Sequence, residues 1–390
     1  MNYEVTKHDQ ELMRKENKGT ILNLIRDLKP VSRSELARIT RMSPTSVSRI
    51  VNELIENGLV QETEPVSGKV GRKALLLDTV PNSVYTVCAH LDPDITRIGI
   101  VNFDGEVIHE RSIICDANQM TWQAFTDKIC DEMQNMIVQS NCDPHKIIGA
   151  GIGVPGLIDT NQGIVLFSPQ LQWKNIKLGS FAQKHLGYPT LIENKVKTKA
   201  LAENTYSLKE NKRRVAFVHF GTGVGSTLIV DNHIFRGSTN SAGEIGHTTI
   251  EPNGRLCDCG RRGCLQTYIT ERALLQDART HKNVSCLQDI FDSAAHQEDW
   301  AVNLLNTLHT YMSMTICNVI CMYNPDIVII GGKLTEQPTN LLQILQRTVN
   351  KMIWSPFKDS YELKMAALGD KAGLLGMSIL IVNRYLDIEL

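Results

Sequence analysis

The chain has 390 residues, 42% of them hydrophobic and 21% charged, which is typical of a folded protein with two or three domains. Its formal net charge of −1 excludes a uniformly basic nucleic-acid binder but leaves room for a local basic patch. The N-terminus lacks the apolar run of a secretory signal, and no segment stays apolar for the roughly 20 residues of a membrane span, so we expect a cytoplasmic protein without a membrane partner.

The first eighty residues carry the pattern of three short helices. The first helix lies in "NKGTILNLIRD" and ends before Pro30, with apolar residues at helical spacing: Ile21, Leu22, Leu24, Ile25 and Leu28. A capping-box pattern over residues 32–35 opens the second helix, "SELARIT". Ser43 and Pro44 supply an N-cap and a first-turn proline for the third helix, "TSVSRIVNELIEN", which Gly58 closes.

The third helix has an apolar stripe and a polar face of hydroxyl residues and one arginine. The stripe consists of Val47, Ile50, Val51, Leu54 and Ile55. After it, "EPVSGKVGRK" reads as the tip of a β-hairpin, or wing, between two strand-like runs. Such a helix can enter a DNA major groove, and the basic residues of the wing can contact DNA phosphates. The alternative is that these elements form a protein-interaction module whose charged loop is merely solvated. We predict DNA contacts from these residues: Arg33, Pro44, Thr45, Ser46, Ser48, Arg49, Lys69, Arg72 and Lys73.

From Val84 onward, short β-rich runs alternate with helical stretches, which indicates an α/β fold with mixed sheets. The runs "VYTVCAHLD", "RIGIVNFDGEVI" and "IIGAGIGVPGLID" surround a helix near residues 122–140. Further on, "RVAFVHFGTGVGSTLIVDNHIFRG" predicts two strands around a glycine turn, and "NPDIVIIGGKL" predicts a buried strand. We expect two α/β lobes with a cleft between them.

The histidine and cysteines of "GHTTIEPNGRLCDCGRRGC" form a local cluster of metal-ligand types. His247, Cys257, Cys259 and Cys264 provide one imidazole and three thiolates, a closed tetrahedral set suited to structural Zn²⁺. In a reducing compartment the ten cysteines of the chain are not expected to form a disulfide framework. A thiol redox switch or a merely buried trio of cysteines are the alternatives.

The motifs after residue 85, taken in order, resemble those of the ROK family, which groups sugar-responsive repressors with sugar kinases. They are "GIGVPGLID", "IEN", "GTGVGS", "SAGEIGH", "CDCGRRGC", "NPDIVIIGG" and "LGDKAGLLG", and the helices and hairpin of residues 32–77 resemble the family's winged helix-turn-helix. The resemblance implies an α/β protein with an N-terminal winged helix-turn-helix and a two-lobed actin-like domain of the sugar kinase type, assembled as a homodimer or homotetramer. We expect a DNA-binding domain at 1–80, a small lobe at 81–195 joined by a C-terminal helix at 375–390, and a large lobe with the zinc loop at 196–374.

The resemblance also places a sugar site between the lobes. In the family Gly156, Asn194, Glu244 and His247 would contact the sugar, and the same histidine would join that site to the zinc site. Lys195 and Gln266 stand where the family has acidic residues. These two, with Lys197 and Lys199 nearby, make the site less acidic, which would suit a sugar phosphate or a sugar acid better than a neutral sugar. The alternative is that Lys197 and Lys199 lie on a solvated helix face and that the pocket binds nothing.

Two departures from the family pattern argue against a kinase. The proton-accepting aspartate of the kinases would follow Asn194, where this chain has Lys195, a cation at neutral pH. The phosphate turn D-x-G-x-T corresponds to "LDPDIT", in which Asp94 and Ile95 replace the two glycines. We therefore expect a repressor, not an enzyme, that binds a pseudo-palindromic double-stranded DNA operator and controls carbohydrate-utilisation genes in response to a sugar or a sugar derivative. An ATP-dependent sugar kinase and a regulator controlled by a protein partner are the alternatives.

Overall fold

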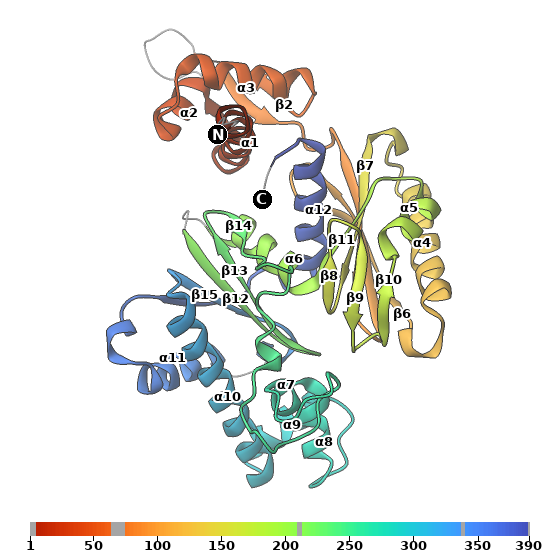
Figure 1. Cartoon of the computed structure of the whole chain (residues 1–390), viewed down its shortest axis with the longest axis vertical. Coiled ribbons are helices and arrows are strands. Elements are labelled where there is room, and N and C mark those ends of the chain that lie inside the picture. Colours follow the sequence, from red (N-terminus) through yellow and green to blue (C-terminus); the bar gives the residue numbers. More distant parts are fainter. Residues whose placement is uncertain (1–4, 64–74, 209–212, 337–339, 389–390) are drawn as a thin grey trace. The chain divides into compact units, whose positions relative to one another are not determined.

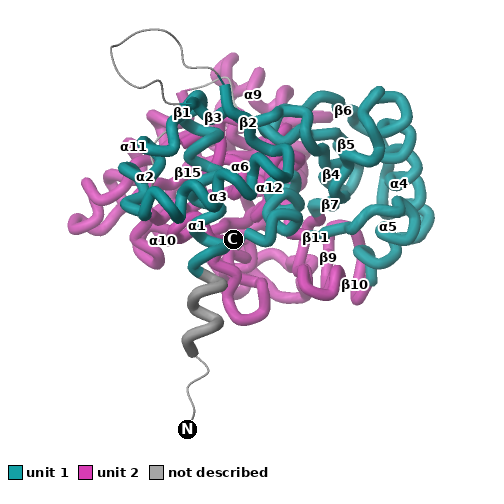
Figure 2. Tube along the Cα trace, turned by 90° about the horizontal axis from the view of Figure 1, so that it is seen from above, with its two compact units in different colours: residues 1–153, 177–192, 377–390 teal, residues 154–176, 193–376 magenta. Residues whose placement is uncertain are grey.

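The structure is a computed structural model that describes residues 5–63, 75–208, 213–336 and 340–388. Contacts divide the chain into two compact units (Figure 2). Unit 1 comprises residues 1–153, 177–192 and 377–390, and unit 2 comprises residues 154–176 and 193–376. The borders of the three expected domains stay predictions, because this division separates two units.

Unit 1 begins with three helices and a small antiparallel sheet that together form the predicted winged helix (Figure 1). The sheet has the strand order β1-β3-β2. β2 pairs with β3 from Val60↔Thr79 to Thr63↔Leu76, so the two strands of the predicted hairpin are present, while its tip with Lys69, Arg72 and Lys73 lies outside the described residues. The elements are α1 (Val5–Leu28), β1 (Val31–Ser32), α2 (Arg33–Thr40), α3 (Pro44–Glu56), β2 (Val60–Thr63) and β3 (Leu76–Thr79).

Helix α1 is much longer than the short helix that the sequence pattern predicts. It ends at Leu28, as expected from Pro30, but begins at Val5. Only its second half carries the apolar stripe, of which Ile21, Leu22 and Ile25 are buried. The first half is rich in Lys, Glu, Arg and Gln, which favour helix without producing an apolar period, so the periodicity could not reveal it.

The predicted serines cap α2 and α3, but the capping box expected for α2 is only half formed, because the carboxylate of Glu35 binds Arg38. The hydroxyl of Ser32 accepts a hydrogen bond from the backbone N–H of Glu35 at 3.2 Å, and the hydroxyl of Ser43 accepts one from Ser46 at 3.1 Å. Gly58 follows α3 with φ +68°, and the Leu59 N–H donates to the carbonyl of Leu54 at 3.0 Å. This is a Schellman motif with glycine in the left-handed position.

Replacing Gly58 by alanine is therefore expected to weaken the C-terminal end of α3 by about 1 kcal/mol, because a side chain is strained at positive φ. A Cβ at this position would meet nothing within 4 Å, so the effect comes from the backbone alone. Amide hydrogen exchange of residues 47–60 measures it as faster local opening. Gly58→Asn, which tolerates the left-handed conformation better, should lose less; equal exchange in all three proteins would contradict the assignment.

The rest of unit 1 is a five-stranded mixed sheet with helices α4 and α5 and the part of α12 that follows Gly376. β4 runs parallel to β7 and antiparallel to β5, and the strand order is β11-β7-β4-β5-β6. α12 packs onto β7 where Gly149 and Gly151 leave room: a Cβ at Gly151 would lie 2.5 Å from Cε of Met377. The elements are β4 (Tyr85–Leu91), β5 (Ile95–Asn102), β6 (Val107–Ile114), α4 (Trp122–Gln139), β7 (Ile147–Val154), α5 (Leu178–Leu186), β11 (Thr190–Asn194) and α12 (Ala372–Tyr385).

Unit 2 has a second five-stranded sheet, of order β14-β13-β12-β15-β16, and a small sheet of order β10-β9-β8. β12 and β13 are antiparallel around the predicted glycine turn, and β15 is the predicted buried strand. The elements are β8 (Leu157–Asp159), β9 (Ile164–Ser168), β10 (Trp173–Ile176), α6 (Lys195–Ala202), β12 (Arg214–Phe220), β13 (Val224–Val230), β14 (His233–Ile234), α7 (Gln266–Ile269), α8 (Glu271–Ala278), α9 (Leu287–Ala295), α10 (Asp299–Tyr323), β15 (Ile327–Gly331), α11 (Leu341–Met352) and β16 (Glu362–Met365).

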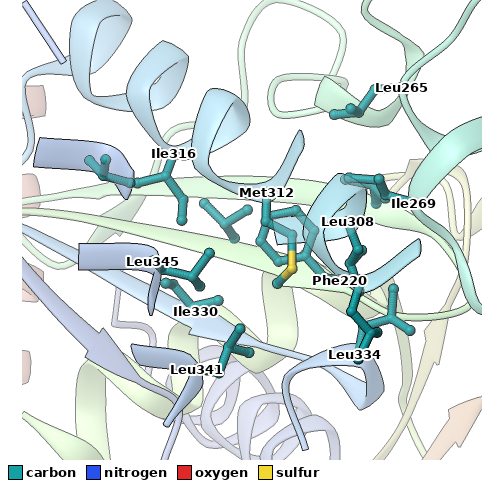
Figure 3. Packing of buried hydrophobic residues seen from close by; sticks show 14 of the residues in the cluster. Phe220, Leu265, Ile269, Leu308, Met312, Ile316, Ile330, Leu334, Leu341 and Leu345 are labelled. Atoms are coloured by element: carbon teal, nitrogen blue, oxygen red, sulfur yellow. The ribbon is translucent and has the colours of Figure 1, made fainter. Parts of the chain in front are cut away.

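The main core of unit 2 lies between this sheet and helices α10 and α11. Figure 3 shows Phe220 and Ile330 from the strands facing Leu308, Met312 and Ile316 of α10. All of them are at most 1% exposed, so burial of apolar surface holds these layers together. Among the described helices, none has the length and apolar character needed to cross a membrane.

Candidate functional site

Helix α3 presents the polar face that the sequence predicts for DNA contact. Val47, Ile50, Val51 and Leu54 are buried, whereas Ile55, the fifth member of the predicted stripe, is only half-buried. The remaining surface of the helix is accessible near its N-terminus, as a helix that enters a major groove requires. Pro44, Thr45 and Arg49 are exposed, and Ser46, Ser48 and Arg33 are half-buried. Arg33 also pairs with Glu62 at 2.9 Å.

The four predicted metal ligands meet in unit 2. Their ligand atoms all lie within 4.8 Å of one another. The Sγ atoms of Cys259 and Cys264 are 3.7 Å apart, and Nδ1 of His247 is 3.7 Å from Sγ of Cys257. In a tetrahedron with metal–sulfur bonds of about 2.3 Å, two sulfur atoms lie about 3.8 Å apart, so the donor set has the size that zinc requires.

The backbone around these ligands turns tightly at glycines. Gly260 has φ +86° and Gly263 has φ +71°, and a Cβ at Gly263 would lie 1.6 Å from the carbonyl oxygen of Glu251. The Cys257 N–H donates to the carbonyl of Arg261 at 2.8 Å, which closes the turn between Cys257 and Cys264. Glycine is therefore required at Gly263 to bring the ligands together.

The protonation of the cluster also fits a cation. Burial, followed by the neighbouring thiols of Cys259 and Cys257, raises the pKa of Cys264 to about 12. Burial, followed by the charge of Arg261, lowers the pKa of His247, so its imidazole is neutral and able to bind a metal. Three thiolates at such distances are stable only around a positive ion. Gln266, which is predicted at the sugar site, donates from Nε2 to Sγ of Cys257 at 3.2 Å.

Two of the predicted sugar residues are joined directly at the start of α6. Asn194 caps this helix, because its Oδ1 accepts from the backbone N–H groups of Val196 and Lys197 at 2.8 and 3.2 Å. Its Nδ2 donates to the carbonyl of Gly156 at 2.8 Å. Gly156 has φ +110°, and a Cβ there would lie 2.3 Å from the carbonyl oxygen of Phe167. The structure thus brings Asn194 and Gly156 together.

Glu244 and His247 belong to the segment that follows β14. Gly243, with φ +95°, holds this segment to β13, because its carbonyl accepts from the Ser226 N–H at 2.7 Å and its missing Cβ would lie 1.9 Å from the Ser226 carbonyl oxygen. Glu244 comes next and precedes the short turn η4 (Ile245–His247). The same turn therefore carries a predicted sugar ligand at one end and a metal ligand at the other.

Lys197 is buried, which the alternative of a solvated helix face did not predict. It is 2% exposed, and Nζ donates to the backbone carbonyl and to Oδ1 of Asn240, the latter at 2.7 Å. Asn240 in turn donates to the carbonyl of Ile158 at 2.8 Å and accepts from Arg236 at 3.0 Å. Arg236 is also ion-paired with the buried Glu193. Lys199 is half-buried, so it agrees only in part with the alternative that both lysines lie on a solvated helix face.

The charges of Lys197 and Glu244 each influence the pKa of the other group. Burial raises the pKa of Glu244, and Lys197 opposes this effect. Burial lowers the pKa of Lys197, and Glu193 is the largest of the charges that oppose it. Sequence reasoning missed this network because Arg236 and Asn240 lie in the loop after β14, far from "IEN" in the chain, and belong to no recognised motif.

Lys195, at the position of the kinase base, is also buried. It is 3% exposed, and Nζ donates to Oγ1 of Thr222 at 3.0 Å in the turn between β12 and β13. In unit 1, the predicted phosphate turn joins β4 to β5, where the Asp92 N–H donates to the Ile95 carbonyl at 2.9 Å. The carbonyl of Asp94 accepts from Cys115 at 3.0 Å, so this turn is bound to the segment after β6.

Known families match both parts of the chain. The model of the ROK family matches residues 94–384, and the model of the MarR family matches residues 17–69. The xylose repressors of Bacillus spizizenii and Bacillus subtilis are both 31% identical to the chain over 97% of its length and 98% of theirs. The DNA-binding transcriptional dual regulator NagC of Escherichia coli is 23% identical over 97% of this chain and 95% of its own.

Solved structures resemble the fold as well. A ROK family transcriptional regulator, a homologue of the Escherichia coli MLC protein, matches with a TM-score of 0.79 and 25% identity over 96% of this chain and 97% of its own. A ROK family glucokinase from Streptomyces griseus matches 76% of this chain and 98% of its own with a TM-score of 0.67 and 23% identity. The fold is an N-terminal MarR-like winged helix followed by an actin-like domain of the sugar kinase type. The chain belongs to the ROK family.

Proposed function

We propose that this protein is a sugar-responsive transcriptional repressor that binds an operator through α3 and its wing. The observation that carries the proposal is the similarity to xylose repressors over nearly the full length of both chains, which includes the DNA-binding part as well as the sugar-binding part. The exposed polar N-terminal half of α3 supports it, since side chains there can reach base edges. The protein acts in the cytoplasm as a homodimer or homotetramer on a pseudo-palindromic site.

The cofactor of this repressor is a structural zinc ion held by His247, Cys257, Cys259 and Cys264. Distances, donor types and burial of the cluster all support this metal. When bound, the ion fixes the ends of the segment 247–264 and neutralises the thiolates. Because the turn η4 begins immediately after Glu244, the ion also fixes the orientation of this carboxylate toward a sugar.

The effector is a sugar or a sugar derivative that contacts Gly156, Asn194 and Glu244, all of unit 2, with His247 joining this site to the metal site. Xylose is the first candidate, because relatives are xylose repressors. Sugar phosphates and sugar acids are the second, since the buried ammonium groups of Lys195 and Lys197 make the site less acidic. A regulator controlled by a protein partner would respond to none of these.

A kinase is the second function that the fold allows, since glucokinases share it. Lys195 opposes it, because an ammonium group that already donates to Thr222 is a poor acceptor for the proton of a sugar hydroxyl. Asp94 and Ile95 oppose it as well, because a carboxylate and a side chain replace the glycines that would admit the phosphates. We therefore assign no catalytic residue.

Xylose is expected to weaken operator binding by about tenfold or more, the usual size of coupling between an effector and a DNA site. Fluorescence anisotropy with the DNA that precedes the protein's own gene, measured with and without xylose, glucose 6-phosphate and xylonate, tests this. Incubation with ATP and each sugar provides the control and should yield no sugar phosphate. An unchanged operator affinity with every sugar would contradict the proposed effector class. Rapid phosphate transfer from ATP to a sugar would support the alternative that the protein is a sugar kinase.

A further inference from the structure

Helix α12 is in backbone contact with the helix that begins at the sugar site. Within unit 2, a Cβ at Gly376 would lie 1.8 Å from the carbonyl oxygen of Thr198 and 2.8 Å from its Cα. Such a short approach is open only to glycine, so α12 and α6 touch through their main chains. Any displacement of α6 at Thr198 therefore displaces α12, because two backbones in contact have no flexible side chain between them to absorb it.

The contact point on α6 is rigidly connected to the predicted sugar residues. Thr198 is fully buried, and its hydroxyl donates to the carbonyl of Lys195 at 2.9 Å. Asn194, which caps the same helix, is bound to Gly156, and Lys197 is tied to the loop that leads to Glu244. Thr198 thus lies one helical turn after the cap.

At its other end, within unit 1, α12 is anchored in the winged helix. The chain leaves α12 through a Schellman motif in which the Ile388 N–H donates to the carbonyl of Asn383 at 2.8 Å and Asp387 has φ +53°. This turn directs Ile388 against α1, where a Cβ at Gly19 would lie 2.8 Å from Cγ2 of Ile388. Lys15 of α1 adds an ion pair with Asp387 at 3.1 Å.

Helix α1 in turn holds the helix that is predicted to read DNA. Nζ of Lys18 and Nη2 of Arg14 both bind the carboxylate of Glu53 on α3, at 2.6 and 3.1 Å. Apolar residues of α12 and of the segment after it share one core with α1 and α3. Val382 and Leu386 are buried members of this core from the C-terminal part of the chain, and the half-buried Ile388 packs against it. Its members from α1 are Ile21, Leu22 and Ile25.

We propose that α12 transmits the occupancy of the sugar site to α3, with Gly376 as its contact with α6 and the 386–388 turn as its contact with α1. The inference rests on the proposed function and adds the route by which the sugar acts on DNA binding. One continuous helix from Ala372 to Tyr385 carries the displacement, since a helix of this length moves as a rigid element. A side chain that forces either contact apart is expected to break the coupling.

The test uses the full chain and measures xylose affinity, operator affinity and the ratio of operator affinities without and with saturating xylose. Gly376→Ala is expected to reduce that ratio from about tenfold to less than twofold while xylose and operator each still bind. Gly19→Ala should act in the same way, because its methyl group displaces Ile388. The double variant Gly19→Ala/Ile388→Ala lacks Cγ2 of Ile388, which the new methyl group would otherwise displace. It should recover part of the ratio of operator affinities without and with xylose. Arg384→Ala, on the exposed side of α12, is the control and should leave the ratio unchanged.

Hydrogen exchange separates a failure of this route from a failure of the proposed function. In Gly376→Ala without any sugar, peptides covering residues 15–28 of α1 should exchange faster than in the wild-type protein, whereas Arg384→Ala should not change them. Unchanged exchange in α1, or a full xylose response in both glycine variants, would overturn the route through α12. If the wild-type protein bound no operator, the proposed repressor function would be refuted. The hydrogen-exchange result would still show whether α12 connects α6 to α1.

Discussion

Replacing Cys264 by serine is expected to remove the zinc ion and to unfold the segment between Thr249 and Cys264. In a structural site the binding energy of the metal is folding energy, on the order of 10 kcal/mol, whereas each internal hydrogen bond of the segment contributes about 1 kcal/mol. The segment has little apolar core of its own, since Cys257 and Cys264 are its only buried hydrophobic residues between 249 and 264. Backbone hydrogen bonds around the bridges Thr249↔Cys264 and Leu256↔Arg262 hold the rest of it, and without the ion they act alone.

Metal content by mass spectrometry and thermal unfolding of the intact chain measure this effect. The wild-type protein should carry a single zinc ion and lose it to a strong chelator together with a large drop in Tm, and Cys264→Ser should be purified without zinc. Cys321→Ser, which changes an exposed cysteine of α10 outside the cluster, is the matched control. If the zinc content of Cys264→Ser equalled that of the control, the assignment of the ligands would be wrong.

Loss of the zinc ion should also affect the predicted sugar site, because one short turn connects His247 to Glu244. Xylose binding by Cys264→Ser is therefore expected to weaken even though Cys264 itself is not one of the predicted sugar contacts. This second effect distinguishes a metal that positions the binding loop from a metal that only stabilises a distant part of the fold.

The sequence predicts the parts of this protein whose chemistry is local. The caps of α3, its buried stripe and the glycine after it can be read from residues 43–58, since each depends on neighbours a few positions away. The spacing of His247, Cys257, Cys259 and Cys264 is likewise sufficient to expect the cluster. The family motifs add the fold of the remaining chain.

The parts that the sequence does not predict depend on contacts between distant segments. Lys197 looks solvent-exposed on a helix, and only its burial against Asn240 shows that it is an interior cation. Gly376 ends the motif "LGDKAGLLG" and Gly19 looks like an ordinary glycine in a helix, but only their distances to Thr198 and Ile388 reveal close approach. The first half of α1 has helix-forming residues but no apolar period, so pattern reading ended the helix too early.

Replacing Arg49 by glutamate is expected to weaken operator binding by about 100-fold or more. Arg49 is exposed on α3, on the side away from the buried residues Val47, Ile50 and Val51, so its charge faces the DNA if α3 enters the major groove. A lost arginine contact is worth about 1–3 kcal/mol, and the new carboxylate adds repulsion from phosphates. The folded state should be unaffected, because an exposed side chain on a helix can be exchanged at little energetic cost.

Anisotropy titrations at two salt concentrations measure this effect and test its cause. The affinity of Arg49→Glu should fall most at low salt, where attraction to phosphates is strongest, and its dependence on salt should be shallower than that of the wild-type protein. Arg213→Glu makes the same change of charge at an exposed residue of unit 2 and should leave operator binding nearly unchanged, which separates a contact at α3 from a general effect of net charge. Equal losses in the two variants would mean that α3 does not read the operator, whereas a loss confined to Arg49→Glu places DNA on the face that the buried stripe of α3 leaves exposed.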